Sequence, residues 1–309
     1  MNKLMKRSNY FFEEIKKCNF CTNPSTENKI LGIRLNTSQG LNPKDKCGIA
    51  VSIFRCSVCN LIYSNPQPIP VNIQEHYGIP PETYWKEEYF SYDPSYFKAQ
   101  ITTAKKIISF EPEMKALDIG SGLGKCMISL SNAGFDTYGI EPSITFRDKA
   151  ISKMGIDADR LKLGMLEEVE YDISTFDFIT FGAVLEHLYD PAVSIKTALN
   201  WLKPGGVIQI EVPSSRWLIS KLFNFYFKMR GTNYVTNLSP MHTPYHMFEF
   251  DIRSFEKLAD QLNFEIVEHH IEVCSIYHIP KLLHPLLKWY MNITNTGMQL
   301  TVWLRKTNT

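Results

Sequence analysis

The sequence predicts an α/β fold, in which a doubly wound, seven-stranded, mostly parallel sheet follows a small N-terminal module that carries cysteines. Two observations lead to this prediction. From about residue 97, short apolar strand patterns alternate with segments whose apolar residues recur at helical spacing. That alternation requires parallel strands with helices on both faces of the sheet. Ahead of it, two C-x-x-C pairs indicate a separate small unit.

The cysteine pairs are Cys18 with Cys21 and Cys56 with Cys59. Four thiolates from two such pairs can surround one zinc ion tetrahedrally, and a closed four-cysteine site leaves no open position for catalysis. We therefore predict a zinc-binding module at residues 1–65, with the zinc in a structural role. The alternatives are chance pairing and a redox dithiol, although the thioredoxin-like strand–helix setting of a redox pair is absent.

A segment rich in proline and tyrosine follows at residues 66–96, and we predict that it links the module to the main domain. Prolines at 66, 68 and 70 favour an extended chain. Tyr89 and Tyr96 are candidates to close over a cationic ligand, because aromatic faces attract cations. Packing between domains is the alternative explanation for these rings.

The most informative motif is LDIGSGLG at residues 117–124, where an apolar strand runs into a glycine turn. Glycines let the backbone bend sharply and approach a ligand closely, and here they are Gly120, Gly122 and Gly124. A dinucleotide fingerprint would need glycine or alanine in place of Lys125. A P-loop would need glycine in place of Ile119 and serine or threonine in place of Cys126. The turn therefore belongs to neither of these two classes of phosphate-binding loop.

The other elements of the main domain, predicted at residues 97–309, continue the alternation. Further strands are predicted at 135–140, 161–163, 176–181 and 207–212, and in FEIVEHHIEV and MQLTVWL. Helices are predicted from Lys125 to Ala133, from a Ser143 cap to Met154, from Pro191 onward, and from an Asp251 cap to Leu262. Because a hairpin-like return joins the last two strands, they can pair antiparallel. Insertions are predicted at about 214–250 and 274–296.

Polar residues gather where the predicted strands end. Glu141 ends the second strand, Met165–Glu167 follow the third, and Glu186 and His187 follow the fourth. In open parallel sheets, ligands lie beyond the carboxyl ends of the strands. The sequence therefore predicts a binding site at this edge of the sheet.

LDIGSGLG, together with GIEPS, FDFITFGAVLEHLYDP and LKPGG, resembles the class I S-adenosylmethionine (SAM) methyltransferases, which have a Rossmann-like fold. The resemblance covers the main domain and implies an enzyme, a SAM-dependent methyltransferase, with SAM as its cofactor. It implies that Asp118 and the glycine turn hold the methionine end of SAM and that Glu141 accepts the ribose hydroxyls. Met165 and Leu166 would flank the adenine, and Ala183 would line the floor of the cofactor site.

The arrangement of two cysteine pairs, an aromatic linker and then such a domain is similar to that of the zinc-containing methyltransferases that modify nucleotide-linked deoxysugars. This second resemblance implies a small-molecule acceptor, a sugar or nucleotide-linked sugar that is methylated on oxygen or carbon in glycan or secondary-metabolite biosynthesis. Two alternatives stay open. One is a methyltransferase for a lipid or quinone-like acceptor, and the other is a non-catalytic interaction protein built on the zinc module.

Transfer to a hydroxyl or an acidic carbon needs a general base, and histidine titrates in the suitable range. The segment MHTPYHMFEF, after the fifth strand, offers His246 first and His242 next, with Tyr245 between them. In the sugar methyltransferases that the chain resembles, a His-containing segment at this place faces the acceptor. His187 in the EHL turn is a further candidate. The alternative is that these residues only cap the core or fix the turn by hydrogen bonding.

Both insertions contain aromatic stretches with interspersed basic residues, at 216–230 and 276–291. These predict a packed lid, a homodimer surface, or peripheral contact with a membrane that holds an apolar acceptor. No stretch reaches the roughly 18 apolar residues of a membrane span. The formal net charge of +1 gives no reason to expect a nucleic-acid partner. Because the N-terminus lacks a secretory signal pattern, we expect a cytoplasmic protein.

Overall fold

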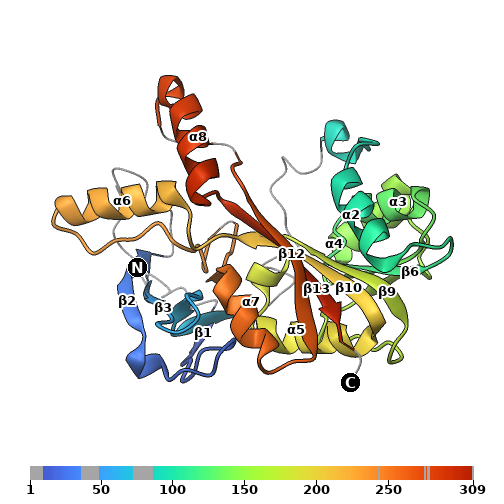
Figure 1. The fold of residues 1–309 in the computed structure, drawn as a ribbon, viewed down its shortest axis with the longest axis horizontal. Coiled ribbons are helices and arrows are strands. Elements are labelled where there is room, and N and C mark those ends of the chain that lie inside the picture. Colours follow the sequence, from blue (N-terminus) through green and yellow to red (C-terminus); the bar gives the residue numbers. More distant parts are fainter. Residues whose placement is uncertain are drawn as a thin grey trace, which may run out of the picture.

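A seven-stranded sheet forms the centre of the fold (Figure 1). The structure, a computed structural model, describes residues 10–35, 49–71, 86–242, 244–274, 276 and 279–307 of the 309-residue chain. The strand order is β12-β13-β10-β9-β6-β7-β8. In chain order these strands are β6 (Lys115–Ile119), β7 (Asp136–Glu141), β8 (Leu161–Leu163), β9 (Phe176–Gly182), β10 (Leu202–Pro213), β12 (Phe264–Glu272) and β13 (Gln299–Lys306).

The pairing of these strands confirms the predicted mostly parallel sheet. The β6–β7, β6–β9, β7–β8 and β9–β10 pairs are parallel, whereas β13 runs antiparallel to both β10 and β12. The central strand β9 is covered on both faces, so its residues Phe178, Ile179 and Phe181 are fully buried. The antiparallel closing pair was also predicted, from the return that joins the last two strands.

Helices cover both faces of the sheet. On one face lie α2 (Lys98–Ile108), α3 (Lys125–Asn132) and α4 (Ile144–Met154), and on the other lie α5 (Pro191–Trp201) and α7 (Ile252–Ala259) (Figure 1). The two predicted caps are confirmed, since Ser143 accepts a hydrogen bond from Phe146 N and Asp251 accepts one from Arg253 N. Such caps satisfy backbone N–H groups that have no partner inside the helix. Helix α7 ends three residues before the predicted end at Leu262.

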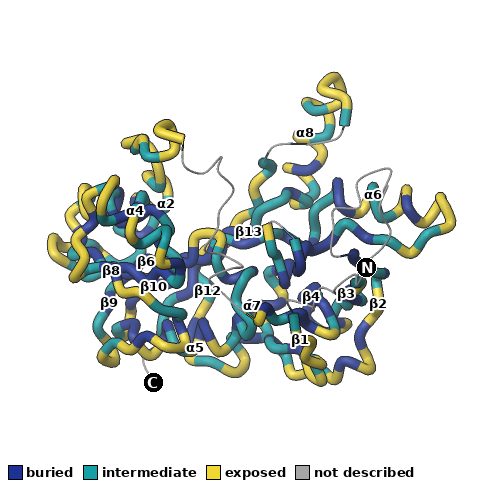
Figure 2. Tube along the Cα trace, turned by 180° about the vertical axis from the view of Figure 1, so that it is seen from behind, coloured by how far each residue is buried: buried dark blue, intermediate teal, exposed yellow. Residues whose placement is uncertain are grey.

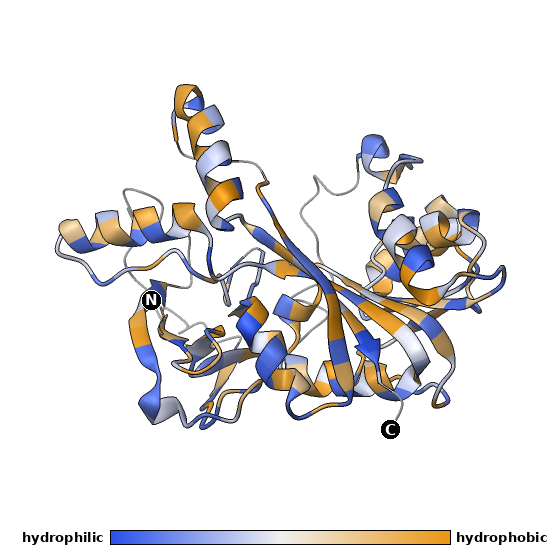
Figure 3. Ribbon diagram, viewed as in Figure 1, coloured by the Kyte–Doolittle hydropathy of each residue, from blue (hydrophilic) through white to orange (hydrophobic). Residues whose placement is uncertain are grey.

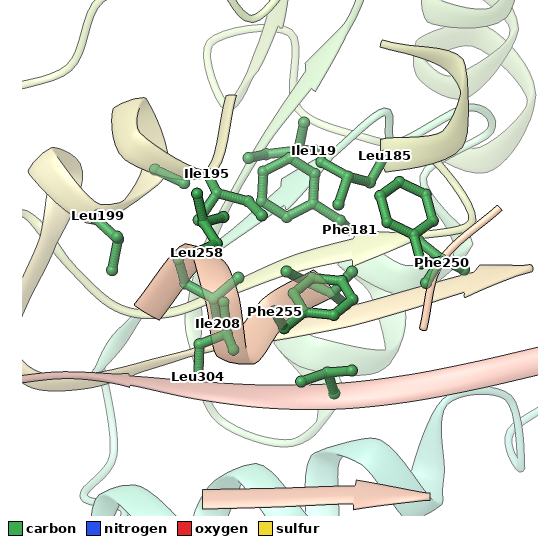
Figure 4. Close-up of a cluster of buried hydrophobic side chains, with 14 of the residues drawn as sticks. Ile119, Phe181, Leu185, Ile195, Leu199, Ile208, Phe250, Phe255, Leu258 and Leu304 are labelled. Atoms are coloured by element: carbon green, nitrogen blue, oxygen red, sulfur yellow. The ribbon is translucent and has the colours of Figure 1, made fainter. Parts of the chain in front are cut away.

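The larger apolar core lies between the sheet and helices α5 and α7 (Figure 4). Phe181 and Ile208 of the sheet face Phe255 and Leu258 of α7, and all four are buried. Burying one such side chain contributes about 1.5–3 kcal/mol. This packing supports the carboxyl end of β9, which leads into the candidate site.

The N-terminal module, which is the described part of residues 10–70, contains a second sheet. It has four strands in the order β11-β4-β3-β2, and the strand β11 comes from the main domain. A separate pair joins β1 to β5. The bounds are β1 (Tyr10–Glu13), β2 (Lys29–Leu35), β3 (Ala50–Arg55), β4 (Ile62–Asn65), β5 (Gln67–Pro70) and β11 (Phe248–Glu249), with a short helix η1 (Ser25–Glu27).

The module and the main domain also share a core. The Phe20 ring lies 5.6 Å from the Phe250 ring and 5.5 Å from the Phe255 ring, measured between centroids. Within the predicted linker, residues 67–70 form β5 and residues 87–90 form η3 (Glu87–Phe90). Residues 72–85 lie outside the described residues. The domain boundaries at 65 and 96 therefore stay predictions, although the two parts pack as one body.

The two predicted insertions contain helices that project from the sheet, α6 (Leu218–Met229) and α8 (His284–Thr294) (Figure 1). Short helices η4 (Leu185–His187) and η5 (Lys281–Leu283) complete the elements. Figure 2 shows exposed stretches along α6 and α8, and Figure 3 shows that both helices contain many hydrophobic residues. Among the helices that the structure describes, none combines the length and the apolar character that a bilayer crossing requires.

Candidate active site

The glycine turn follows β6 and has the backbone geometry that only glycine adopts easily. Gly120 has φ of +71° and Gly122 has φ of +55°, in a region that costs other residues about 1–2 kcal/mol. A Cβ on Gly120 would lie 2.5 Å from Cγ2 of Val184. A Cβ on Gly122 would meet nothing within 4 Å. Gly120 is therefore needed for packing against the segment after β9, while Gly122 leaves open space for a ligand.

Glu141 connects this turn to the end of β7. Its two carboxylate oxygens accept hydrogen bonds from Gly122 N, at 2.7 Å, and from Ser143 N, at 2.8 Å. The side chain is buried, and burial raises the pKa of Glu141 to about 7 despite these two hydrogen bonds. The buried Glu141 carboxyl at the end of β7 therefore holds the glycine turn and places a hydrogen-bond acceptor beside it.

A cavity of about 290 Å³ opens above the turn. It brings together five of the predicted cofactor-binding residues, namely Tyr89, Tyr96, Asp118, Gly120 and Gly122. The rest of its lining comes from residues that the sequence reasoning did not assign to the site, which are Phe97, Ser121, Leu123, Lys125, Cys126, Phe146 and Gly182.

Asp118 supplies the buried acid of this cavity. Burial raises the pKa of Asp118 to about 7, although the Cys126 thiol favours the charged form of the carboxyl. The Ser121 hydroxyl donates to the main-chain oxygen of Asp118 at 2.8 Å. The Lys125 Nζ atom lies 5.0 Å from the centre of the Tyr89 ring, so one cation already approaches this aromatic wall. A carboxyl beside aromatic rings suits a ligand that carries positive charge.

The described lining of the cavity does not include the other predicted cofactor residues, which are Gly124, Glu141, Met165, Leu166 and Ala183. Leu166 is buried in the large core. Met165 N donates to Glu168 Oε2 at 3.3 Å, and Ala183 N donates to Glu211 O at 3.0 Å. Gly124 is the N-cap residue directly before α3, and a Cβ on it would lie 2.6 Å from Cγ1 of Ile156.

A second cluster of polar residues forms at the end of β9, on the short helix η4. Glu186 Oε1 lies 3.7 Å from His246 Nε2 and 4.0 Å from His187 Nε2. The two imidazole rings are 5.0 Å apart between centroids. The other oxygen of Glu186 is buried and has no hydrogen-bond partner among the described residues.

Burial sets the protonation of this cluster. It raises the pKa of Glu186 to about 8, with the charge of Glu211 adding to the effect. It lowers the pKa of His246 to about 3, with a smaller contribution from His187, and it also lowers the pKa of His187. Both imidazoles are therefore neutral at physiological pH and can accept a proton.

Two further predicted residues lie in the same loop but make different contacts. His242 Nε2 lies 3.1 Å from Arg34 Nη2 on β2, and burial, with the nearby Arg34, lowers the pKa of His242 to about 4. Tyr245 has φ of +66°, and its carbonyl oxygen lies 3.2 Å from His187 Nδ1. The structure thus brings His187 and His246 together through the Tyr245 backbone, and holds His242 against the N-terminal module.

The cavity and the histidine cluster lie on one edge of the sheet because both use the end of β9 and the segment that follows it. Gly182 lines the cavity, Val184 packs on Gly120, and Glu186 contacts the histidines. Sequence reasoning placed Glu186 at a strand end but not in the site. The available signal was a carboxylate between the apolar residues of the turn VLEHL, since a buried charge needs a partner or a function.

The four cysteines of the N-terminal module meet at one point. Cys18 Sγ lies 3.5 Å from Cys59 Sγ, Cys21 Sγ lies 3.3 Å from Cys56 Sγ, and all four sulfurs lie within 4.8 Å of one another. A tetrahedral zinc with Zn–S bonds of about 2.3 Å holds its sulfurs about 3.8 Å apart. The arrangement of the sulfurs therefore fits one zinc ion.

The two C-x-x-C turns have the same backbone hydrogen bonds. Cys18 N donates to Asn23 O and Thr22 N donates to Cys18 O, and in the second turn Cys56 N donates to Leu61 O and Asn60 N donates to Cys56 O. Thr22 and Asn60, each directly after its pair, both have positive φ. The two turns share one geometry and bring their four sulfurs together. Chance is therefore a poor explanation for the two C-x-x-C pairs.

Comparison with known proteins gives a family and a set of relatives. Residues 89–269 match the family described as "Methyltransferase domain". The chain is 28% identical over 134 residues to a ubiquinone biosynthesis O-methyltransferase of Bradyrhizobium diazoefficiens, covering 42% of this chain and 50% of that protein. It is 25% identical over 195 residues to the protein of the same name from Burkholderia ambifaria, covering 62% and 78%.

Among solved structures, a SAM-dependent methyltransferase from Methanosarcina mazei aligns with a TM-score of 0.48 and 17% identity, over 65% of this chain and 95% of that one. The match to the Bradyrhizobium protein spans only half of that protein's length.

Proposed function

The chain belongs to the methyltransferase-domain family, and on that premise we propose that it transfers the methyl group of SAM to a hydroxyl oxygen of a quinone-like acceptor. The observation that carries the proposal is the position of the Glu186–His246 pair directly after the segment that lines the glycine-turn cavity. One sheet edge thus offers a cavity for a cofactor and a basic group for an acceptor.

The cavity has the chemistry that SAM requires. When bound, SAM supplies a methyl group on a sulfonium, whose sulfur leaves as a neutral thioether. We assign Asp118 to the methionine end, since its buried carboxyl can accept from an amine, and Tyr89 and Tyr96 to the cationic centre. Gly122, which has open space where a Cβ would lie, leaves room for the ligand.

The rest of the cofactor assignment concerns the ribose and the adenine. Each oxygen of Glu141 accepts one backbone N–H and retains a lone pair for a ribose hydroxyl. Met165 and Leu166 stay our proposal for the adenine side, because the loop that carries them starts at Gly164, whose N–H donates to Glu141 O at 3.2 Å. We also propose, as the sequence predicts, that Ala183 and Gly124 lie beside the cofactor.

His246 is the proposed general base. Its imidazole is neutral at physiological pH and would take the proton of an acceptor hydroxyl during transfer. Because burial lowers the pKa of His246 to about 3, it is a weak base until Glu186 ionises. Glu186, whose Oε1 lies 3.7 Å from Nε2, would stabilise the imidazolium that forms once its own carboxyl is ionised. His187 and the Tyr245 carbonyl position this loop, and His242 is the second candidate for the base.

The acceptor assignment follows the relatives rather than the cysteine module. The Bradyrhizobium and Burkholderia proteins are named as ubiquinone biosynthesis O-methyltransferases, which supports the quinone-like alternative. The sugar acceptor that the second resemblance implied has no support from these names. The zinc that the four cysteines fit is proposed as structural, because a closed four-sulfur site offers no open position to a substrate.

The test is a transfer assay with SAM that carries a labelled methyl group. The acceptors are a hydroxylated benzoquinol with a short prenyl chain and, separately, a nucleotide-linked deoxysugar. We expect label in the quinol and none in the sugar. Label in the sugar alone would overturn the acceptor class. Label in neither, with SAM still bound, would favour the non-catalytic interaction protein.

A further inference from the structure

Helices α6 and α8 each expose an apolar stripe. On α6 the exposed residues are Leu222, Phe225, Tyr226 and Met229, and on α8 they are Leu286, Trp289, Tyr290 and Ile293. Both sets follow the spacing i, i+3, i+4, i+7, which places four side chains on one face of a helix. Phe225 is 63% exposed, Met229 71% and Trp289 60%. Single exposed apolar residues are common, but two stripes of four large side chains are not.

The opposite faces of the two helices already have packing partners. Ile219 of α6, Met291 of α8 and Ile276 form a small buried core, with Phe223 and Leu287 packed against it. Leu218 N, at the start of α6, donates to Thr296 O just after α8 at 3.0 Å. The helices are therefore held as a pair, and the exposed stripes are not the faces that fold the protein.

The charge around these helices has one sign. Residues 212–248 contain four Lys or Arg and no Asp or Glu, and residues 273–297 contain two Lys and no Asp or Glu. The whole chain has 33 basic and 32 acidic residues, so this distribution differs sharply from the average. Lys221 and Lys228 of α6 and Lys288 of α8 are exposed beside the stripes. Apolar faces flanked by cations match the acyl boundary and headgroups of an anionic bilayer.

We infer that α6 and α8 together form a docking surface for an anionic lipid bilayer. Hydrogen-bonded side chains link α6 to the segment that carries His246. Asn224 of α6 donates to Asn237, and Asn237 donates to Glu249, three residues after His246. A bilayer on this surface would bring an apolar acceptor to the sheet edge that carries the site. Docking itself requires neither SAM nor acceptor, so it can hold or fail independently of the proposed methyl transfer.

Co-sedimentation with vesicles tests the inference. Phosphatidylcholine vesicles with and without phosphatidylglycerol are mixed with the full chain at low salt and at ~1 M salt, where the Debye length falls to about 3 Å. We expect the chain to pellet with the phosphatidylglycerol vesicles at low salt, and at least ~10-fold less at high salt or without phosphatidylglycerol. No pelleting with anionic vesicles at low salt would overturn the inference.

Variants locate the surface. Phe225→Ser with Trp289→Ser, and separately Lys228→Gln with Lys288→Gln, should each lose most of the vesicle binding. Ile173→Ser and Lys106→Gln are matched controls, since both positions are exposed and lie outside the two helices. Equal binding by all variants would contradict the inference. So would a wild-type dimer in sedimentation velocity that becomes monomeric in the Phe225→Ser, Trp289→Ser variant, because the stripes would then be an interface between two copies.

Discussion

The glycine-turn region and the histidine region lie on the same edge of the sheet but are assembled in different ways. In the first, Gly122 and its partner Glu141 are 19 residues apart in one strand–helix–strand unit. In the second, His187 meets the Tyr245 carbonyl 58 residues later, and His242 meets Arg34 across 208 residues. The glycine-turn region, the proposed cofactor side, is therefore a local structure, whereas the histidine region, the proposed acceptor side, also contacts the N-terminal module. Substitutions in one region should therefore have effects that differ from those of substitutions in the other.

The largest expected effect comes from the cysteine cluster. Structural zinc contributes about 10–16 kcal/mol to the folding of zinc-finger peptides, so Cys56→Ser should lose bound zinc and lower the thermal stability strongly. Because β4 of the module pairs with β11, beside His246, the acceptor side should be lost first. Zinc content by atomic absorption and thermal unfolding are the measurements. Cys274→Ser is the control, because Cys274 lies outside the cluster. A wild type without zinc would contradict this prediction.

His246→Asn should affect the acceptor side alone. Loss of a general base lowers the rate by about 10²–10⁴-fold, whereas affinity for SAM should stay within a few-fold of wild type. The measurements are methyl transfer to the quinol and SAM titration on one preparation. His269→Asn is the control, as that histidine is exposed on β12. Full activity in His246→Asn would move the base to His242.

Gly120→Ala should affect both the glycine-turn region and the histidine region, because Gly120 packs on Val184, which lies in the segment that leads to Glu186. The strain of positive φ costs about 1–2 kcal/mol, and the contact with Val184 shifts the turn, so SAM affinity should fall at least ~10-fold. Gly155→Ala is the matched control, since Gly155 has nearly the same φ, +72°, with nothing within 4 Å of an added Cβ. Equal SAM affinity in the two variants would show that the Val184 contact has no role in cofactor binding.

A smaller effect is expected in the pH dependence. Burial raises the pKa of Glu186 to about 8, so its carboxyl is neutral below that pH and ionises above it. Ionised Glu186 attracts a proton to His246 and makes it a stronger base, so transfer should rise as pH increases through about 8. The same raised pKa means that the folded state retains a proton between about 4.3 and 8, and stability falls with rising pH in that window.

Glu186→Gln should remove the rise in rate with pH and weaken the dependence of stability on pH. The rate should become flat through pH 8, and the decrease of stability with pH should be smaller than in wild type. Rate profiles and urea unfolding over this range are the measurements. A rate profile unchanged by Glu186→Gln would mean that another group sets it.

The difference between the two regions also explains what could be predicted from the sequence. The seven strands, the Ser143 and Asp251 caps and the cavity residues Asp118, Gly120 and Gly122 follow from periodicity and turn chemistry, which act over a few residues. The structure confirms the seven-stranded, mostly parallel sheet, which could be predicted because it too follows from this periodicity. The role of each site residue stays a prediction.

Contacts between distant segments could not be predicted. Nothing in the sequence near His242 indicates Arg34, and nothing near Phe248 indicates that it pairs with Tyr63 of the N-terminal module. Such pairs are set by tertiary packing, which has no local pattern. The Glu186–His246 contact is intermediate, since the buried carboxylate is visible in VLEHL but its partner is not.

The central claim is that the glycine-turn cavity holds SAM, and isothermal titration of SAM into the wild-type chain tests it most directly. We predict saturable binding of one SAM per chain, retained in His246→Asn and weakened at least ~10-fold in Gly120→Ala. The absence of binding heat in the wild type, with no thermal shift on adding SAM, would contradict the account.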